Sequence, residues 1–228
     1  MVFVISITAN AEIINLSLNP AGWNRPAQWY NGTNYNDTQA TITQTAEGYL
    51  QVTQLTTLGG SNFGLRLVTN ASYDFQNATL QYKWLANGMG KYSAYTSGIN
   101  GLTEYLDPYP KYNALTTVDS YDGTEVIPSN QWLYTQLVFS PTGYQFWVSM
   151  IGYGNTDFLH GSFAYDSTTW NALGNANFFM WLGDNYGSGA YFQVSEASLI
   201  TTPEPSLLIQ LGFGLIAVIA CGWRYGSK

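Results

Sequence analysis

Residues 79–84 read TLQYKW and decide the fold class of this chain. Leu80, Tyr82 and Trp84 alternate with polar residues, so a two-residue period places the three large side chains on one face of a strand. Residues 63–67 show the same alternation around Arg66. Both stretches predict half-buried β-strands, with one face toward a core and the other toward solvent.

A hairpin is predicted further along the chain. Leu133, Leu137 and Phe139 share one face of a strand that leads into Ser-Pro-Thr-Gly at 140–143. This tetrapeptide is a turn signal, and the alternation resumes over 144–150. We therefore expect two antiparallel strands joined by a tight turn.

Two more strands are predicted near residue 200. The run 178–182 is apolar throughout, as expected for a central strand. Residues 191–201 form a second strand. Along it the inward-facing apolar positions change from even-numbered to odd-numbered residues. The apolar residues on either side of the change are Phe192, Val194, Ala197 and Leu199. Such a change requires a β-bulge, which we place near Ser195 or Glu196.

The composition agrees with an all-β chain. Of the 228 residues, 16% are aromatic and 9% are charged, a mixture that favours strands over helices. We predict a two-sheet antiparallel β-sandwich, a jelly roll, over residues 12–200. The strand at 131–139, the turn after it and the late strand and loop at 181–184 resemble concanavalin-like and laminin-G-like sandwiches. This resemblance covers roughly residues 40–200, and it implies a fold that often binds sugars and calcium.

The C-terminal end carries a separate signal. A Pro-Glu-Pro tripeptide precedes the uncharged apolar run 207–223, and two basic residues follow. As a helix, these 17 residues would rise about 26 Å, slightly less than the roughly 30 Å of a bilayer core. The residues that frame the run are Pro203, Glu204, Pro205, Arg224 and Lys228. We predict a C-terminal transmembrane sorting helix with a short basic end over 207–228, after a linker at 201–206 that contains the Pro-Glu-Pro motif.

This tail resembles the PEP-CTERM sorting signal. The resemblance implies an exported bacterial protein whose tail is recognised by an exosortase and cleaved near the motif, in a host that makes exopolysaccharide. The basic end departs from the usual Arg-rich cluster, because it contains only Arg224 and Lys228. A plain C-terminal membrane anchor is the alternative.

The N-terminal end is compatible with export. Residues 2–8 are mostly apolar, and Ala9-Asn10-Ala11 has the small-x-small form of a signal-peptide cleavage site. The first positive residue is Arg25, so the usual basic region is missing. We interpret residues 1–11 as a truncated signal peptide. The alternative is that they form the first strand of the domain.

Several classes of function are disfavoured. The formal net charge of −7 argues against nucleic acid as a partner. The lone Cys221 lies in the tail, so the body forms no disulfide. His160 is the only histidine, and we expect it in an exposed loop. No Gly-x-Ser-x-Gly elbow or phosphate-binding Gly-Lys loop is present.

Glycoside hydrolysis is the enzymatic alternative. It needs two carboxylates facing across a cleft, about 5–5.5 Å apart for retention or about 6.5–9.5 Å for inversion. The candidates are Glu47, Glu104, Glu125 and Glu196. The apolar strand 178–182 carries no carboxylate, so we favour a protein without catalytic activity.

A calcium site is predicted around Gly123. Asp119, Asp122 and Glu125 surround this glycine, and calcium takes six to eight oxygen ligands. The alternative is an Asp-Gly turn in a solvated acidic loop.

Aromatic residues suggest a sugar-binding groove. Sugar rings pack their C–H faces on Tyr and Trp, whose polar tips suit half-exposed positions. Five tyrosines fall in a region rich in Gly and Pro, namely Tyr92, Tyr95, Tyr105, Tyr109 and Tyr112. Trp23, Trp29 and Tyr30 lie in a similar polar setting. The alternative is that these rings cap the ends of the sandwich.

The sequence therefore predicts an exported, non-enzymatic protein, held briefly by its tail, that associates with envelope or matrix polysaccharide. A glycosidase acting on the same material and a structural surface protein without a ligand are the alternatives.

Overall fold

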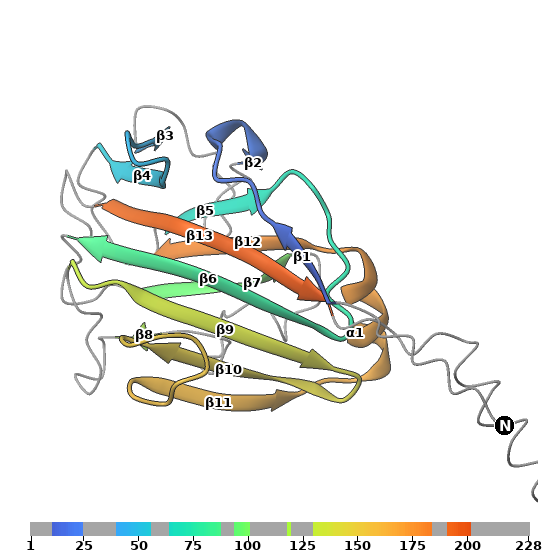
Figure 1. Cartoon of the computed structure of the whole chain (residues 1–228). Coiled ribbons are helices and arrows are strands. Elements are labelled where there is room, and N and C mark those ends of the chain that lie inside the picture. Colours follow the sequence, from blue (N-terminus) through green and yellow to red (C-terminus); the bar gives the residue numbers. More distant parts are fainter. Residues whose placement is uncertain are drawn as a thin grey trace, which may run out of the picture.

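The computed structural model describes residues 11–24, 40–55, 64–87, 94–100, 118–119, 130–183 and 191–201. Within these ranges the chain forms two antiparallel sheets, as predicted (Figure 1). The larger sheet has eight strands, in the order β11-β10-β9-β6-β13-β4-β3, with β1 also paired to β13. Its strands are β1 (Glu12–Asn15), β3 (Ala40–Gln44), β4 (Leu50–Gln54), β6 (Ala78–Asn87), β9 (Leu133–Ser140), β10 (Gly143–Ser149), β11 (Leu159–Ala164) and β13 (Tyr191–Thr201).

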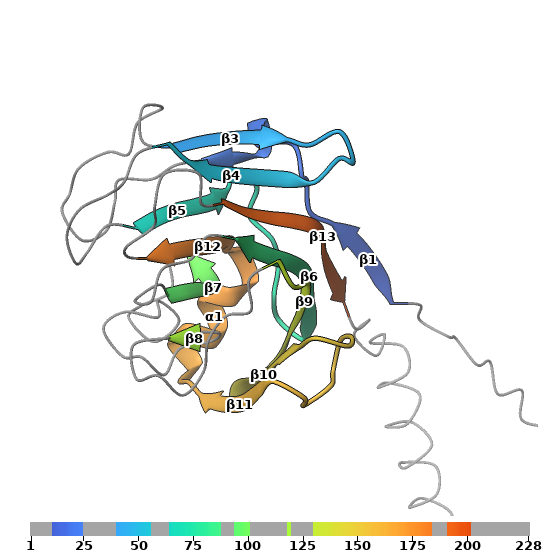
Figure 2. The ribbon, with the colours of Figure 1, turned by 90° about the vertical axis from the view of Figure 1, so that its left-hand side faces the viewer.

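The smaller sheet has five strands, in the order β2-β5-β12-β7-β8. Its strands are β2 (Trp23–Asn24), β5 (Gly64–Thr69), β7 (Ala94–Asn100), β8 (Val118–Asp119) and β12 (Asn177–Gly183). Strand β12 contains the apolar run 178–182 and lies between β5 and β7, which confirms the predicted central strand. Figure 2 shows the eight-stranded sheet curving around this smaller sheet.

The predicted alternation of inward and outward side chains along β6 is confirmed. Leu80, Tyr82 and Trp84 are fully buried, whereas Gln81 and Lys83 between them are only partly buried. The indole Nε1 of Trp84 donates a hydrogen bond to Thr135 Oγ1 at 3.0 Å, so its polar group is satisfied inside the core. Strand β6 therefore presents an apolar face to the sandwich core and a polar face outward.

The predicted hairpin and bulge are also confirmed. Strands β9 and β10 pair from Gly143 opposite Ser140, so the turn between them consists of Pro141 and Thr142. In β13 the register with β6 shifts between Val194 and Glu196. Because of this shift, both halves of β13 direct their apolar residues into the core.

Short helices complete the described fold. The 3-10 helix η1 (Pro20–Gly22) leads into β2, and α1 (Ser167–Ala172) with η3 (Leu173–Asn175) connects β11 to β12. Asp166 caps α1 by accepting a hydrogen bond from Thr169 N at 2.8 Å. No helix in the described ranges is long and apolar enough to span a membrane.

Both predicted targeting segments lie outside the described residues. Residues 1–10 of the predicted signal peptide and the tail from 202 to 228 are not described. The tail residues concerned are Pro203, Glu204, Pro205, Arg224 and Lys228. Strand β1 begins at Glu12, and its register partner Thr201 ends β13, so these two positions lie side by side at one corner of the large sheet.

Candidate functional site

The outer face of the eight-stranded sheet carries an aromatic cluster around one lysine. Side chains alternate along a strand, so Lys83 of β6 and Tyr134 of β9, which are register partners, both point away from the core. Lys83 Nζ lies 4.9 Å from the ring centroid of Tyr134 and 5.4 Å from that of Trp132. At these distances both rings attract the ammonium group through cation–π interactions.

Two further aromatic residues extend this cluster. Tyr49, next to β4, packs edge-on against Trp132 with ring centroids 5.4 Å apart. Tyr153 packs edge-on against Tyr134 at 5.2 Å. We call Tyr49, Lys83, Trp132, Tyr134, Tyr153 and Glu196 the outer cluster. Its six members come from parts of the chain that are adjacent only because β4, β13, β6 and β9 lie next to one another.

Tyr153 reaches the outer cluster because the loop between β10 and β11 folds over the sheet. Its hydroxyl donates a hydrogen bond to Glu196 Oε1 on β13 at 3.0 Å. Burial raises the pKa of the Tyr153 phenol, and the negative charge of Glu196 raises that pKa further. The Gly154 Cα lies close enough to β9 that a Cβ there would stand 3.8 Å from the Gln136 amide. The loop therefore forms one wall of the outer cluster.

Glutamine pairs lie beside the outer cluster. Gln81 Nε2 donates to Gln136 Oε1 at 2.7 Å, which links β6 to β9. Gln193 Nε2 donates to Gln51 Oε1 at 2.7 Å, which links β13 to β4. Each amide keeps further donor and acceptor positions beyond this one bond. Together with the half-buried rings, these amides can contact a polyhydroxylated molecule through both C–H faces and hydroxyl groups.

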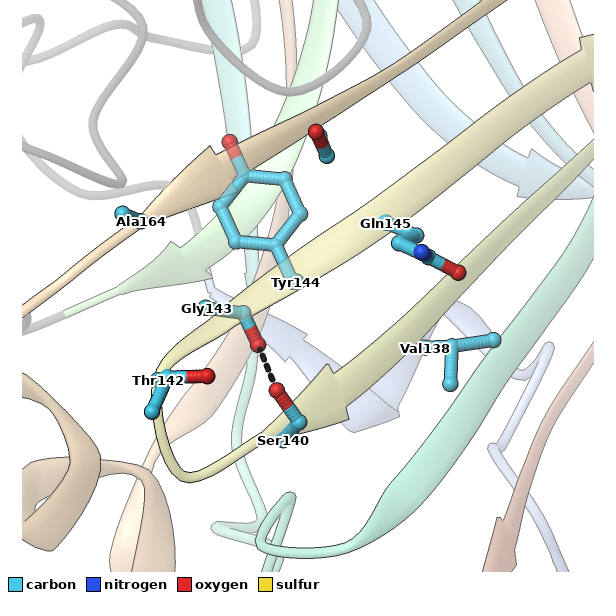
Figure 3. A pocket seen from close by; sticks show the side chains of 8 residues that line it. Val138, Ser140, Thr142, Gly143, Tyr144, Gln145 and Ala164 are labelled. Atoms are coloured by element: carbon cyan, nitrogen blue, oxygen red, sulfur yellow. Dashed lines mark hydrogen bonds between the residues drawn. The ribbon is translucent and has the colours of Figure 1, made fainter.

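A shallow hollow of about 380 Å³ lies on the same sheet, at the turn between β9 and β10 (Figure 3). Its lining combines small and apolar groups with hydroxyl and amide groups, namely Val138, Ser140, Thr142, Gly143, Tyr144, Gln145, Ser162 and Ala164. Ser140 Oγ donates to the Gly143 carbonyl at 2.8 Å, so its proton is used within the turn. The outer cluster has more aromatic surface than this hollow, and we take the cluster as the candidate site.

Most residues of the predicted sugar groove lie outside the described residues. Tyr95 belongs to β7, where its backbone pairs with Leu182 and Val118. Tyr92, Tyr105, Tyr109 and Tyr112 are not described, nor are Trp29 and Tyr30. Trp23 is described, and its assignment to a groove is wrong. It is 5% exposed, packs on Phe178 and donates from Nε1 to the Ser17 carbonyl at 2.9 Å.

The predicted calcium site is likewise only partly described. Asp119 lies in β8, opposite Ala94 of β7, whereas Asp122 and Glu125 are outside the described residues. In the part of the chain that the structure describes, no group of three or more His, Cys, Asp or Glu side chains could hold a metal ion.

The remaining candidate residues are dispersed. Glu47 is exposed in the turn between β3 and β4, and Glu196 belongs to the outer cluster. Glu104 and Glu125 are not described. His160 is exposed, as expected, but the predicted loop is wrong. It lies in strand β11, opposite Trp147 of β10.

Comparison with known proteins identifies the fold. No family model matches the chain, and no curated protein matches it in sequence. Among solved structures, a non-specific endo-β-1,3(4)-glucanase of family GH16 superposes with a TM-score of 0.51 at 11% identity, over 87% of this chain and 94% of the glucanase. A winged bean acidic lectin complexed with methyl-α-D-galactose gives 0.50 at 8% identity, over 86% and 100%.

A glycosyl hydrolase family protein from Mycobacterium fortuitum gives a TM-score of 0.50 at 12% identity, over 80% of this chain and 93% of that protein. At such low identities the likeness concerns the fold alone. It confirms the predicted resemblance to concanavalin-like jelly rolls. The chain thus has a sandwich fold that both a lectin and glycan-cleaving enzymes share.

Proposed function

We propose that this protein is exported and that its β-sandwich binds an envelope or matrix polysaccharide without cleaving it. The observation that carries the proposal is the outer cluster, in which half-buried Tyr and Trp rings surround Lys83 and lie beside amide pairs. Aromatic rings offer flat apolar surfaces to the C–H faces of sugars, and amides bond to sugar hydroxyls. The solved structures of similar fold include a galactoside-bound lectin and a glucanase, which supports a sugar as ligand.

Export rests on the tail. Its Pro203-Glu204-Pro205 motif, the apolar run 207–223 and the basic Arg224 and Lys228 favour an exosortase-sorted protein that is first anchored in the membrane and then released to the surface or matrix. Intact-mass spectrometry of the protein from its native host would test this. A mature chain ending near residue 205 supports sorting, and a chain that retains Lys228 argues for a plain anchor.

Carbohydrate binding can be tested with the purified full chain on an array of neutral and acidic polysaccharides, followed by affinity electrophoresis in the polysaccharide that binds. Trp132→Ala removes one ring of the outer cluster and should weaken binding about three- to tenfold. Thr43→Ala is the control. Thr43 lies on edge strand β3, is exposed on the same outer face of the eight-stranded sheet as Trp132, and lies outside the cluster. Equal binding by both variants and by the unaltered chain would place the ligand elsewhere.

The same samples separate the alternatives. An assay for newly formed reducing ends should stay at background. Their release, and its loss in Glu196→Gln, would replace the binding proposal with a glycosidase. A chain that neither binds nor cleaves any polysaccharide would leave a structural surface protein as the remaining alternative.

A calcium ion at Asp119, Asp122 and Glu125 stays a prediction, which titration calorimetry with calcium would test.

A further inference from the structure

The corner where β1 meets the end of β13 combines an exposed apolar side chain with the exit of the chain toward its tail. Ile13 of β1 and Ile200 of β13 are register partners on the outer face. Ile13 is 63% exposed, and Ile200 is partly buried. A single exposed isoleucine is ordinary on a protein surface. Ile13 matters here because of its position, beside the point where the chain leaves the sandwich toward its tail.

The length of the chain beyond Thr201 limits how far this corner can lie from a membrane. Only residues 202–206 separate Thr201 from Leu207, where the apolar run begins. Even fully extended, the six steps from Thr201 to Leu207 span at most about 21 Å. If the run 207–223 enters a bilayer, the corner is held within this distance of the bilayer surface.

We infer that the corner formed by Ile13 and Ile200 rests on the lipid bilayer while the tail is anchored. This inference rests on the anchored state of the proposed function. The short tether keeps the corner at high effective concentration near the lipid, so a small apolar contact is enough to hold it there. The contact inserts the Ile13 side chain into the interfacial region and sets the orientation of the sandwich.

The same orientation places the outer cluster away from the membrane. The opposite end of β13 begins at Tyr191, which pairs with Thr53 of β4. With about 3.3 Å per residue, the ten steps from Tyr191 to Thr201 separate the two ends of the strand by roughly 33 Å. Glu196 of the outer cluster pairs with Lys83 midway along β13, five steps or roughly 16 Å from Thr201. At that distance from the corner, a polysaccharide outside the membrane can reach the cluster.

A second exposed apolar pair is an alternative membrane contact on the same domain. Met150 and Ile151 lie in the loop between β10 and β11, and Ile151 is 72% exposed. This loop begins after Ser149, the register partner of Tyr134 in the outer cluster. It is therefore far from the exit at Thr201, and the short tether favours the Ile13 corner over it.

Fluorescence quenching in vesicles tests the inference. The full chain with Cys221→Ala is reconstituted into phosphatidylcholine–phosphatidylglycerol vesicles that carry a nitroxide on the lipid headgroup. A fluorophore is attached at Asn15→Cys, which is exposed on β1 two residues from Ile13, or at Thr53→Cys on the same face at the far end. We expect the probe at position 15 to lose most of its emission and the probe at position 53 to keep it.

A substitution at the contact itself completes the test. Ile13→Asp in the chain labelled at position 15 should restore much of the emission, because a carboxylate resists entry into the interface. Position 13 is exposed, so this change should leave the fold intact, as circular dichroism would verify. Equal quenching at 15 and 53, or stronger quenching at 53, would overturn the inference. A chain that does not associate with vesicles at all would instead contradict the anchoring assumed in the proposed function.

Discussion

Strand β6 presents Leu80, Tyr82 and Trp84 to the core and Gln81 and Lys83 to the outer face. The inward side chains are fully buried in the core between the two sheets, whereas Gln81 and Lys83 contact Gln136 and Tyr134 on the neighbouring strand of the same sheet. Residues that alternate in sequence therefore serve different purposes. The inner face fixes the fold, and the outer face can change its chemistry at little cost in stability. Three sets of variants test this difference between the two faces.

The largest effect is expected from comparing two tryptophans. Trp84→Ala removes a fully buried side chain and leaves the Thr135 hydroxyl without its indole donor, so we expect a loss of about 3–5 kcal/mol in the free energy of unfolding. Trp132→Ala on the outer face should cost about 1 kcal/mol or less. Urea denaturation of both variants measures the difference. Similar losses would contradict the division between the faces.

A smaller effect is expected where the core meets edge strand β11. A Cβ on Gly161 would stand 2.7 Å from Cε1 of the buried Phe146, so Gly161→Ala should cost about 1–3 kcal/mol through overpacking. The neighbouring Ser162→Ala, on the exposed side of the strand, serves as the control. Adding Phe146→Leu should recover part of the loss, since it removes the ring that the new methyl group meets. Unchanged stability of Gly161→Ala would show that β11 is not packed against the core.

The smallest effect is expected on the outer face itself. Tyr153→Phe removes the hydrogen bond to Glu196, which should cost about 1 kcal/mol at neutral pH. The raised pKa of Tyr153 means that the folded state prefers the protonated phenol. Its contribution is complete below pH of about 10 and declines as the pH rises further.

Denaturation at neutral and alkaline pH tests this linkage. The alkaline loss of stability should be smaller in Tyr153→Phe than in the unaltered chain, with Tyr49→Phe as a control. Some loss should remain in every variant, because burial also raises the pKa of Tyr165 to about 12. An identical alkaline decline in the unaltered chain and Tyr153→Phe would argue that the loop does not hold Tyr153 against Glu196.

Local periodicity was sufficient for several elements. The alternation in β6, the two-residue turn after Ser140 and the parity change in β13 were all readable from the sequence, because each reflects a preference of nearby residues. The sequence pattern does not predict strand β11, and the reason is physical. Its inward position 161 is a glycine that makes room for the ring of Phe146, so an apolar residue is absent where the pattern needs one.

The outer cluster could not be read from the sequence. Lys83 meets Tyr134 only because β6 pairs with β9, and Tyr153 meets Glu196 only because a loop crosses the sheet. Pairing between distant strands leaves no local pattern. Trp23 shows the same limit, since polar neighbours suggested exposure while its indole packs on Phe178.

The position of Thr201 also bears on how the domain withstands mechanical load. Strand β13, which ends there, is an inner strand that pairs with β6 over ten register positions and with β1 at its end. A pull on this end along the strand axis slides β13 against its neighbours, so many backbone hydrogen bonds share the force and must break together. Forced unfolding is governed by the rate of that rupture. A tether attached here is therefore stronger than one on edge strand β11, which can be peeled away one bond at a time.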